Sequence, residues 1–187
     1  GTIEKATNLI PTTKSVIFLA FNVTIKDELA KRAPKHVKAM TLNSAGYESL
    51  RYALKLNGKH GTKVDGANVK TLLDNSIKDK YKYITIEEID VIKPLANRLV
   101  SLYKATGLPV NMNTFNELSN KHALLSIFEN EYDPNNVISL VKDILDINLN
   151  ILTNNWYAID FDDQIYLPVT KNLPIEKYDF VIVDETQ

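Results

Sequence analysis

The feature that most constrains the fold is a continuous apolar run at residues 15–21, Ser-Val-Ile-Phe-Leu-Ala-Phe. The run has the length of a β-strand, and its apolar residues do not alternate with polar ones. A strand that is apolar on both sides is typical of a parallel sheet covered on both faces. Residues 178–183, Tyr-Asp-Phe-Val-Ile-Val, predict a second buried strand of this kind. These two runs favour an α/β architecture.

The segment that follows the first run extends this pattern. We predict a helix over residues 25–32, a strand over residues 36–42 and a second helix over residues 44–56. Strand, helix, strand and helix in this order are typical of right-handed βαβ units. A short helix is also expected at residues 2–9.

The character of the sequence changes after a turn-rich, basic loop at residues 58–66. Apolar residues then recur at helical spacing, so we expect residues 67–154 to be all-helical. Strand-like composition returns afterwards and predicts short strands over residues 156–161 and 164–167.

Local signals mark where the helices of this middle region begin. Thr85 and Thr114 each precede a glutamate by three residues, which is the spacing of a capping box. Asp133 followed by Pro134 is a typical N-cap and first helical position. We expect the helices from Thr114 and Pro134 to extend to about residues 130 and 153, and Pro94 to kink or split the helix from Thr85.

Composition excludes several classes of protein. Hydrophobic residues make up 44% and charged residues 24%, a globular balance that argues against a disordered or fibrous chain. Cysteine is absent, which excludes disulfides and thiolate metal sites. No apolar run approaches the ~20 residues of a membrane span, and no signal-peptide core follows the first residues. We expect a cytoplasmic protein with no membrane partner, in the host cytoplasm if the source is a phage.

Charge is distributed unevenly along the sequence. Residues 1–82 hold 15 Lys and Arg against 7 Asp and Glu, whereas residues 83–187 hold the remaining 7 against 16. A basic half favours a polyanionic partner, and the acidic half favours metal binding or a regulatory role. Two solvated faces without such partners are the plainer interpretation.

Two adjacent carboxylates, Asp184 and Glu185, follow the last predicted strand. Open α/β sheets bind ligands at the carboxyl ends of their strands. In phosphoryl-transfer ATPases an acid at this position holds Mg²⁺, and a neighbouring acid can position the attacking water. A polar turn after a strand is the alternative interpretation.

Polar and aromatic residues also follow the first two predicted strands. Phe21 can stack on a base and Asn22 can bind a nucleic-acid backbone. Thr41, Asn43 and Ser44 place hydroxyls and an amide at a helix N-terminus, which is a favourable phosphate site. The alternatives are a core phenylalanine with a turn asparagine, and an ordinary N-cap.

Three acids lie within four residues at Asp160, Asp162 and Asp163. Such a cluster can bind a cation, although a helix cap or a polar turn is the commoner role. Together with Asp184 these acids raise the alternative of a metal-dependent nuclease, because acid clusters support two-metal chemistry. No lysine accompanies them at nuclease-like spacing.

Together these segments resemble motifs of the superfamily 1A DNA helicases, the UvrD/Rep-like group. Residues 19–22 with the helix after them resemble motif Ia, and residues 41–47 resemble motif Ib. Residues 159–163 resemble the Asp-Phe-Asp-Asp stretch of the family, and residues 178–187 resemble motif II, the Walker B box. The resemblance spans essentially the whole chain.

The resemblance implies a fold and a domain organisation. Residues 1–60 and 155–187 would form a partial RecA-like (P-loop NTPase) domain 1A with a parallel sheet. Residues 61–154 would be an inserted helical subdomain similar to 1B. The change of character near residue 60 and the return of strands near residue 156 agree with this division.

The resemblance also implies site residues and ligands. With Mg²⁺ and ATP as cofactors, Asp184 would serve the metal, Glu185 would activate the attacking water and Gln187 would sense the γ-phosphate. Asn43 stands where the family usually has histidine, so one DNA contact is expected to differ. The residues implied to contact single-stranded or partly duplex DNA are Phe21, Asn22, Thr41, Asn43, Ser44, Phe161 and Asp162.

One family motif is missing from the sequence. There is no G-x-x-x-x-G-K-[ST] phosphate loop, which the family places directly before a helix like that at residues 2–9. We therefore expect a helicase fragment that does not hydrolyse ATP alone, whose partners include the remaining helicase domains. Its sheet should have an unfilled position or an open edge that invites pairing with another chain. The alternative is a non-enzymatic nucleic-acid or protein binding module with a degenerate nucleotide site.

Overall fold

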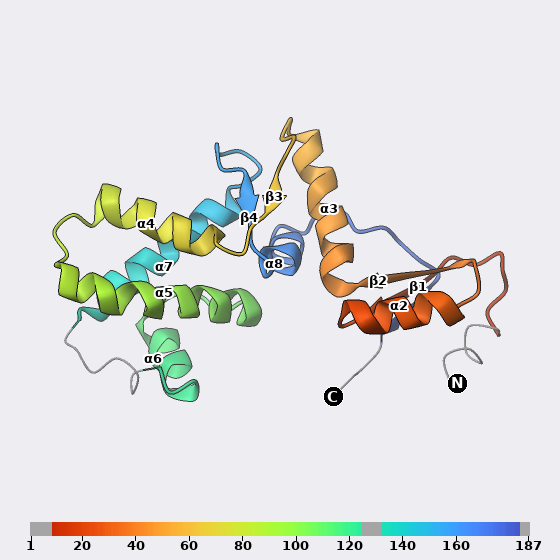
Figure 1. Ribbon diagram of the computed structural model, residues 1–187, viewed down its shortest axis with the longest axis horizontal. Helices are drawn as coiled ribbons and strands as arrows, with labels where there is room; N and C mark the ends of the chain where they lie inside the picture. Colours follow the sequence, from red (N-terminus) through yellow and green to blue (C-terminus); the bar gives the residue numbers. More distant parts are fainter. Residues whose placement is uncertain (1–8, 125–131, 184–187) are drawn as a thin grey trace.

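A small parallel sheet forms one end of the molecule (Figure 1). The computed structural model describes residues 9–124 and 132–183. Strands β1 (Val16–Ala20), β2 (Val37–Thr41) and β5 (Phe180–Val183) lie in the order β2-β1-β5. Both pairings are parallel, so the carboxyl ends of the three strands meet at one edge of the sheet. The mixed α/β architecture with a parallel sheet is thus confirmed.

Two helices follow the first two strands, and side-chain caps begin both of them. The Asn22 carboxamide oxygen accepts a hydrogen bond from the Ile25 amide at the start of α2 (Val23–Arg32). The Thr41 hydroxyl oxygen accepts one from the Ser44 amide at the start of α3 (Leu42–Leu56). Each cap satisfies an amide that has no partner within its helix.

Strand β5 is more exposed than the sequence predicts. Val181 is 56% exposed, and Phe180 and Val183 are similarly accessible. Only Ile182 packs against the small cluster of β1 and α2 side chains. The prediction of a strand buried on both faces is wrong for β5, because within the described residues it has a single neighbouring strand, β1.

Four helices form the opposite end of the molecule (Figure 1). These are α4 (Asn68–Lys80), α5 (Ile86–Thr106), α6 (Met112–Lys121) and α7 (Pro134–Leu149). Their apolar faces meet in the largest hydrophobic cluster among the described residues. Its fully buried members include Leu73, Ile92, Leu95, Ala96, Leu99, Val100, Val137, Leu140, Val141 and Ile144.

The helix boundaries differ from the sequence predictions in three places. Helix α5 runs unbroken through Pro94, whose side chain is exposed, so water can satisfy the carbonyl that the proline leaves unpaired. Helix α6 begins two residues before Thr114, because Asn111 is its N-cap and Thr114 completes the capping box. Helices α6 and α7 end at Lys121 and Leu149, earlier than expected, and residues 125–131 lie outside the described residues.

The junction between the two ends contains a helix where the sequence predicts a strand. Residues 164–167 belong to α8 (Asp163–Thr170), whose buried residues Asp163, Gln164 and Leu167 recur at helical spacing. The strand expected over residues 156–161 is reduced to β4 (Ala158–Ile159). It pairs in parallel with β3 (Lys63–Val64), in the segment expected to be a loop.

Helix α8 packs closely against α3 at the centre of the molecule (Figure 1). A Cβ atom on Gly46 of α3 would lie 2.0 Å from the Gln164 carbonyl oxygen, so only glycine fits there. A second hydrophobic cluster, centred on Leu50, Leu54 and Ile159, fills the rest of this junction.

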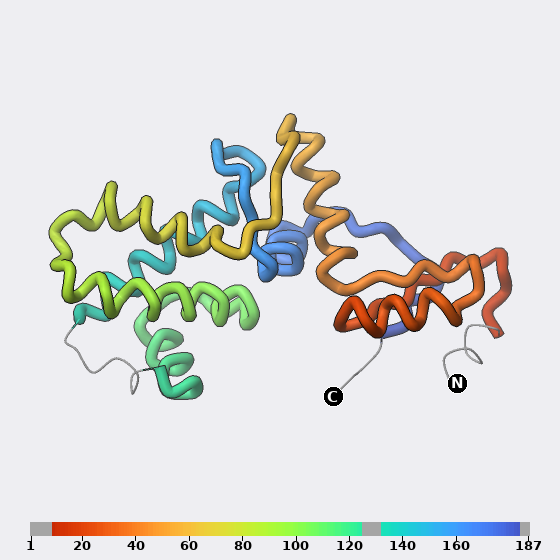
Figure 2. The backbone as a smooth tube through the Cα atoms, in the orientation of Figure 1, coloured from red at the N-terminus to blue at the C-terminus, as the bar shows by residue number. Residues whose placement is uncertain are grey.

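The molecule is elongated, with the sheet at one end and the helices at the other (Figure 2). The chain passes between them in the segments that carry β3 and β4. The division into domains at residues 60 and 155 stays a prediction. None of the described helices has the length and apolar character needed to cross a bilayer.

Candidate nucleic-acid interface

The carboxyl end of β1 presents an aromatic ring to solvent. Phe21 is 70% exposed, which excludes the core role that the sequence left open for it. The side-chain oxygen of Asn22 is engaged as the cap of α2, so this residue has a structural role as well. An exposed ring beside a helix N-terminus is a combination that suits stacking on a base next to a phosphate.

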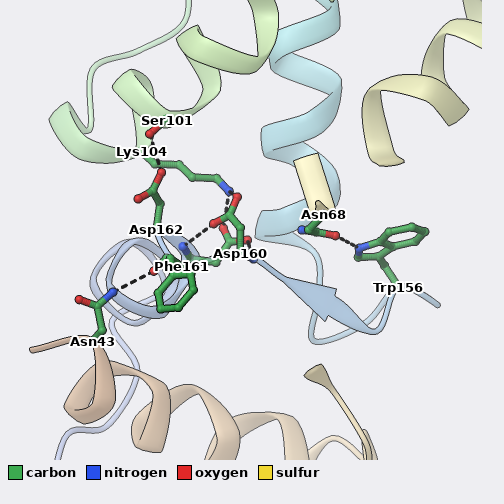
Figure 3. A network of polar contacts seen from close by, with 9 residues as sticks. Asn43, Asn68, Ser101, Lys104, Trp156, Asp160, Phe161 and Asp162 are labelled. Carbon is green, nitrogen blue, oxygen red and sulfur yellow. Dashed lines mark hydrogen bonds and ion pairs between the residues drawn. The ribbon is translucent and has the colours of Figure 1, made fainter. Parts of the chain in front are cut away.

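Residues at the end of β2 have two roles: some cap helix α3, and one makes a long-range contact. Thr41 is buried, and its hydroxyl also donates to the Ser44 hydroxyl at 2.8 Å, so these two side chains mainly build the start of α3. Asn43 instead reaches outward. Its side-chain nitrogen donates to the Phe161 carbonyl oxygen at 3.0 Å, across 118 residues of sequence (Figure 3).

The acidic segment forms a compact turn at the start of α8. The Asp160 amide donates to the Asp163 carboxylate at 3.0 Å, and the Asp163 amide donates back to the Asp160 carboxylate at 2.9 Å. These reciprocal bonds close the turn on both sides. Phe161 lies between them and is 64% exposed. The turn therefore holds a second aromatic ring in solvent, beside the start of α3.

A buried lysine from α5 holds this turn in place. The Lys104 ammonium nitrogen lies 2.7 Å from the Asp160 carboxylate (Figure 3). It lies 2.8 Å from the Asp163 carboxylate. Burial raises the pKa of the Asp163 carboxyl above its ordinary value, and the nearby Asp160 charge adds to this rise. The Lys104 charge opposes it. Two carboxylates therefore share one cation in a poorly solvated site.

The third acid of the cluster is also engaged. The Ser101 hydroxyl, one turn before Lys104 on α5, donates to the Asp162 carboxylate at 2.6 Å (Figure 3). Within the described ranges no three His, Cys, Asp or Glu side chains gather where they would hold a metal ion. The contacts of these three acids are those expected of a turn, and the nuclease alternative also needs Asp184, which lies outside the described residues.

Sequence reasoning missed both Lys104 and Ser101. The sequence holds one indication that Lys104 is buried. It lies four residues after Val100 and so falls on the apolar face of α5. A lysine on a buried stripe needs an acidic partner. The sequence does not show which acids those are, since they lie about sixty residues away.

The residues of the motif II resemblance fall at the limit of the structure. Asp184, Glu185 and Gln187 lie outside the described residues. The described part of that segment is residues 178–183, which include β5, and Val183 of β5 pairs with Leu19, two residues before Phe21.

Comparisons with known proteins add no relative. The chain matches no protein-family model, no curated protein and no solved structure.

Proposed function

We propose that this chain is the DNA-facing part of a superfamily 1A, ATP-dependent DNA helicase, and that it binds single-stranded DNA at the carboxyl edge of its sheet. The observation that carries the proposal is the hydrogen bond from Asn43 to the Phe161 carbonyl oxygen. It joins the segments that resemble motif Ib and the Asp-Phe-Asp-Asp stretch, which the sequence separates widely.

The chemistry of this edge suits a single strand. Phe21 and Phe161 offer exposed rings, and base–aromatic stacking contributes about 1–3 kcal/mol per base. The N-termini of α2 and α3 lie at the same edge, where amide groups and the helix dipole favour phosphates. The excess of lysine and arginine before residue 83 supports attraction of the backbone over longer distances.

The nucleotide chemistry is proposed for the whole helicase. There Asp184 would hold Mg²⁺ with ATP, Glu185 would activate water and Gln187 would sense the γ-phosphate, in a RecA-like domain completed by the remaining helicase domains. The 187 residues include no phosphate loop with its lysine, so we expect no ATP hydrolysis from them alone.

The test is fluorescence anisotropy with a labelled oligo-dT at several salt concentrations. We expect weak binding that falls steeply with salt. Phe21→Ala/Phe161→Ala removes two stacking rings and should weaken it further, by about 30-fold or more. Tyr83→Ala, which removes an equally exposed ring at the helical end, is the matched control and should bind like the wild type. Salt-independent binding, or equal losses in both variants, would refute the proposal.

A second candidate, a non-enzymatic binding module, is favoured by the engaged side chains at the edge. Thr41 and Asn22 cap helices, and Asp160 and Asp163 pair with Lys104, so each has a structural role without any ligand. Glu185→Gln in the intact parent separates the candidates. It should abolish ATP turnover if the helicase proposal holds and leave activity unchanged if the module is correct.

A further inference from the structure

A hollow of about 610 Å³ lies beside α3, from the middle of the helix to the loop after its C-terminal end. It is bounded by one face of the helix and by the loop that leads to β3. Figure 1 shows α3 rising from the sheet to this loop. The lining residues are Glu48, Arg51, Tyr52, Leu54, Lys55, Lys59, His60, Gly61 and Thr62.

The charge of this hollow is positive and largely uncompensated. Arg51 and Lys55 are exposed one turn apart, and neither forms an ion pair with any residue in the described ranges. The one acid of the lining, Glu48, is already paired with Lys38 at 3.2 Å. Among the residues that the structure describes, these two cations therefore have no acidic partner.

Lys59 also lines the hollow, and its side chain is buried. Its ammonium group contacts the backbone carbonyl oxygens of Asn154 and Trp156 and lies 4.9 Å from the centre of the Tyr157 ring. None of these partners is a carboxylate, and burial lowers the pKa of the Lys59 ammonium. The partners of Lys59 in the described residues are therefore all neutral, so its charge adds to the positive potential of this region.

An exposed aromatic ring stands among these cations. Tyr52 is 57% exposed and lies between Arg51 and Lys55 on α3. Cations alone attract any polyanion, whereas cations interleaved with an accessible ring also suit the bases of an unpaired strand. The exposed ring therefore favours a single-stranded nucleic acid over other polyanions as the ligand.

We propose that the hollow binds the phosphodiester backbone of a single-stranded nucleic acid, with Arg51 and Lys55 on phosphates and Tyr52 stacked on a base. The assignment to nucleic acid rests on the proposed function. Arg51 and Lys55 lie nine and thirteen residues after Leu42, the first residue of α3, so they are about 14–20 Å along the helix from the strand edge. One strand following the helix would therefore occupy both places.

The test measures binding of labelled oligo-dT by anisotropy as a function of salt. Arg51→Ala/Lys55→Ala should weaken binding at least several-fold at low salt and reduce the slope of log K against log salt by about 1.4, which is two phosphate contacts. Tyr52→Ala should weaken binding with the slope unchanged. Lys78→Ala/Lys82→Ala removes two exposed lysines at the helical end and is the charge-matched control, expected to retain wild-type affinity.

The outcomes separate this inference from the proposed function. If Arg51→Ala/Lys55→Ala binds oligo-dT like the wild type, the hollow is not a binding site, even if Phe21→Ala/Phe161→Ala binds weakly. If Lys78→Ala/Lys82→Ala loses as much affinity as Arg51→Ala/Lys55→Ala, the proposal for the hollow is also wrong. If only Arg51→Ala/Lys55→Ala binds more weakly, the hollow is a binding site and the proposed binding at the strand edge is refuted. Titration with tripolyphosphate tests a free phosphate ligand. If the hollow variant loses tripolyphosphate binding but keeps oligo-dT binding, the assignment to nucleic acid is wrong.

Discussion

The two ends of the molecule differ in how completely they bury their own apolar surface. At the helical end, α4 to α7 enclose a continuous cluster whose central members are fully buried. At the sheet end, the buried cluster consists of Phe18, Ala20 and Leu29, while side chains of β5 face solvent. A closed core and an open sheet are therefore built from one chain.

This difference indicates a division of roles. Burial of apolar surface is the main stabilising contribution in folding, so the helical end supplies most of the fold's stability. The sheet end contributes a polar edge, exposed rings and accessible apolar surface instead. Lys104 connects the two, because it lies on a helix of the closed core and holds the Asp160–Asp163 turn of the open end.

The largest expected effect comes from breaking this connection. Lys104→Met leaves two buried carboxylates without a cation, and removing one partner of a buried ion pair costs about 3–5 kcal/mol. Without Lys104 the pKa of Asp163 rises further above its unfolded value, so the folded state binds a proton more tightly than the unfolded state. Stability of the variant should therefore increase as pH falls, and urea denaturation at pH 8 and pH 5 measures this.

The matched control is on the same helix. Lys93 pairs with the half-exposed Asp74, so Lys93→Met should cost at most about 1 kcal/mol, with little pH dependence. Lys104→Met/Asp163→Asn should recover part of the loss, because one buried charge is removed. If Lys104→Met and Lys93→Met have equal free energies of unfolding, the contacts of Lys104 with Asp160 and Asp163 do not stabilise the junction between the two ends.

The contrast in burial gives the second prediction. Leu99→Ala at the helical end deletes fully buried atoms and should cost about 2–5 kcal/mol. Val181→Ala on β5 removes methyl groups that are half exposed and should change stability by about 0.5 kcal/mol or less. Similar losses in thermal or urea unfolding would mean that the β5 surface is buried in solution and that the contrast is wrong.

A smaller effect is expected at the junction. Gly46→Ala places a methyl group against the Gln164 carbonyl and should cost about 1–3 kcal/mol by pushing α3 from α8. Gly66→Ala is the control, since a Cβ there meets no atom within 4 Å. If both variants unfold at the same temperature, α3 and α8 do not pack as closely as described.

Local sequence patterns predict most of the fold. The strand at residues 15–21, the helix after it and the next strand and helix follow from apolar runs and periodicity alone. The exposure of β5 does not, because the number of neighbouring strands is a property of the whole sheet. Helix α8 was missed for another reason: its eight residues are too few to distinguish a helical period from a strand.

Individual residues of the candidate interface were predictable from the sequence, but the contacts between them were not. Phe21 and Asn43 are candidates because they lie at the ends of predicted strands, whereas Phe161 is a candidate only through the helicase resemblance. The structure brings Asn43 and Phe161 into contact. The support beneath them was not predictable, because Lys104 lies on a distant helix and an ion pair over that separation depends on tertiary packing.

The most direct test of the strand edge is a titration of the isotope-labelled chain with oligo-dT, followed by NMR at low salt. We expect the largest shifts at the amides of Phe21, Asn22 and Phe161 and at the side-chain amide of Asn43, with α6 unaffected. Shifts confined to the helical end, or none at low ionic strength, would contradict the assignment of this edge to nucleic acid.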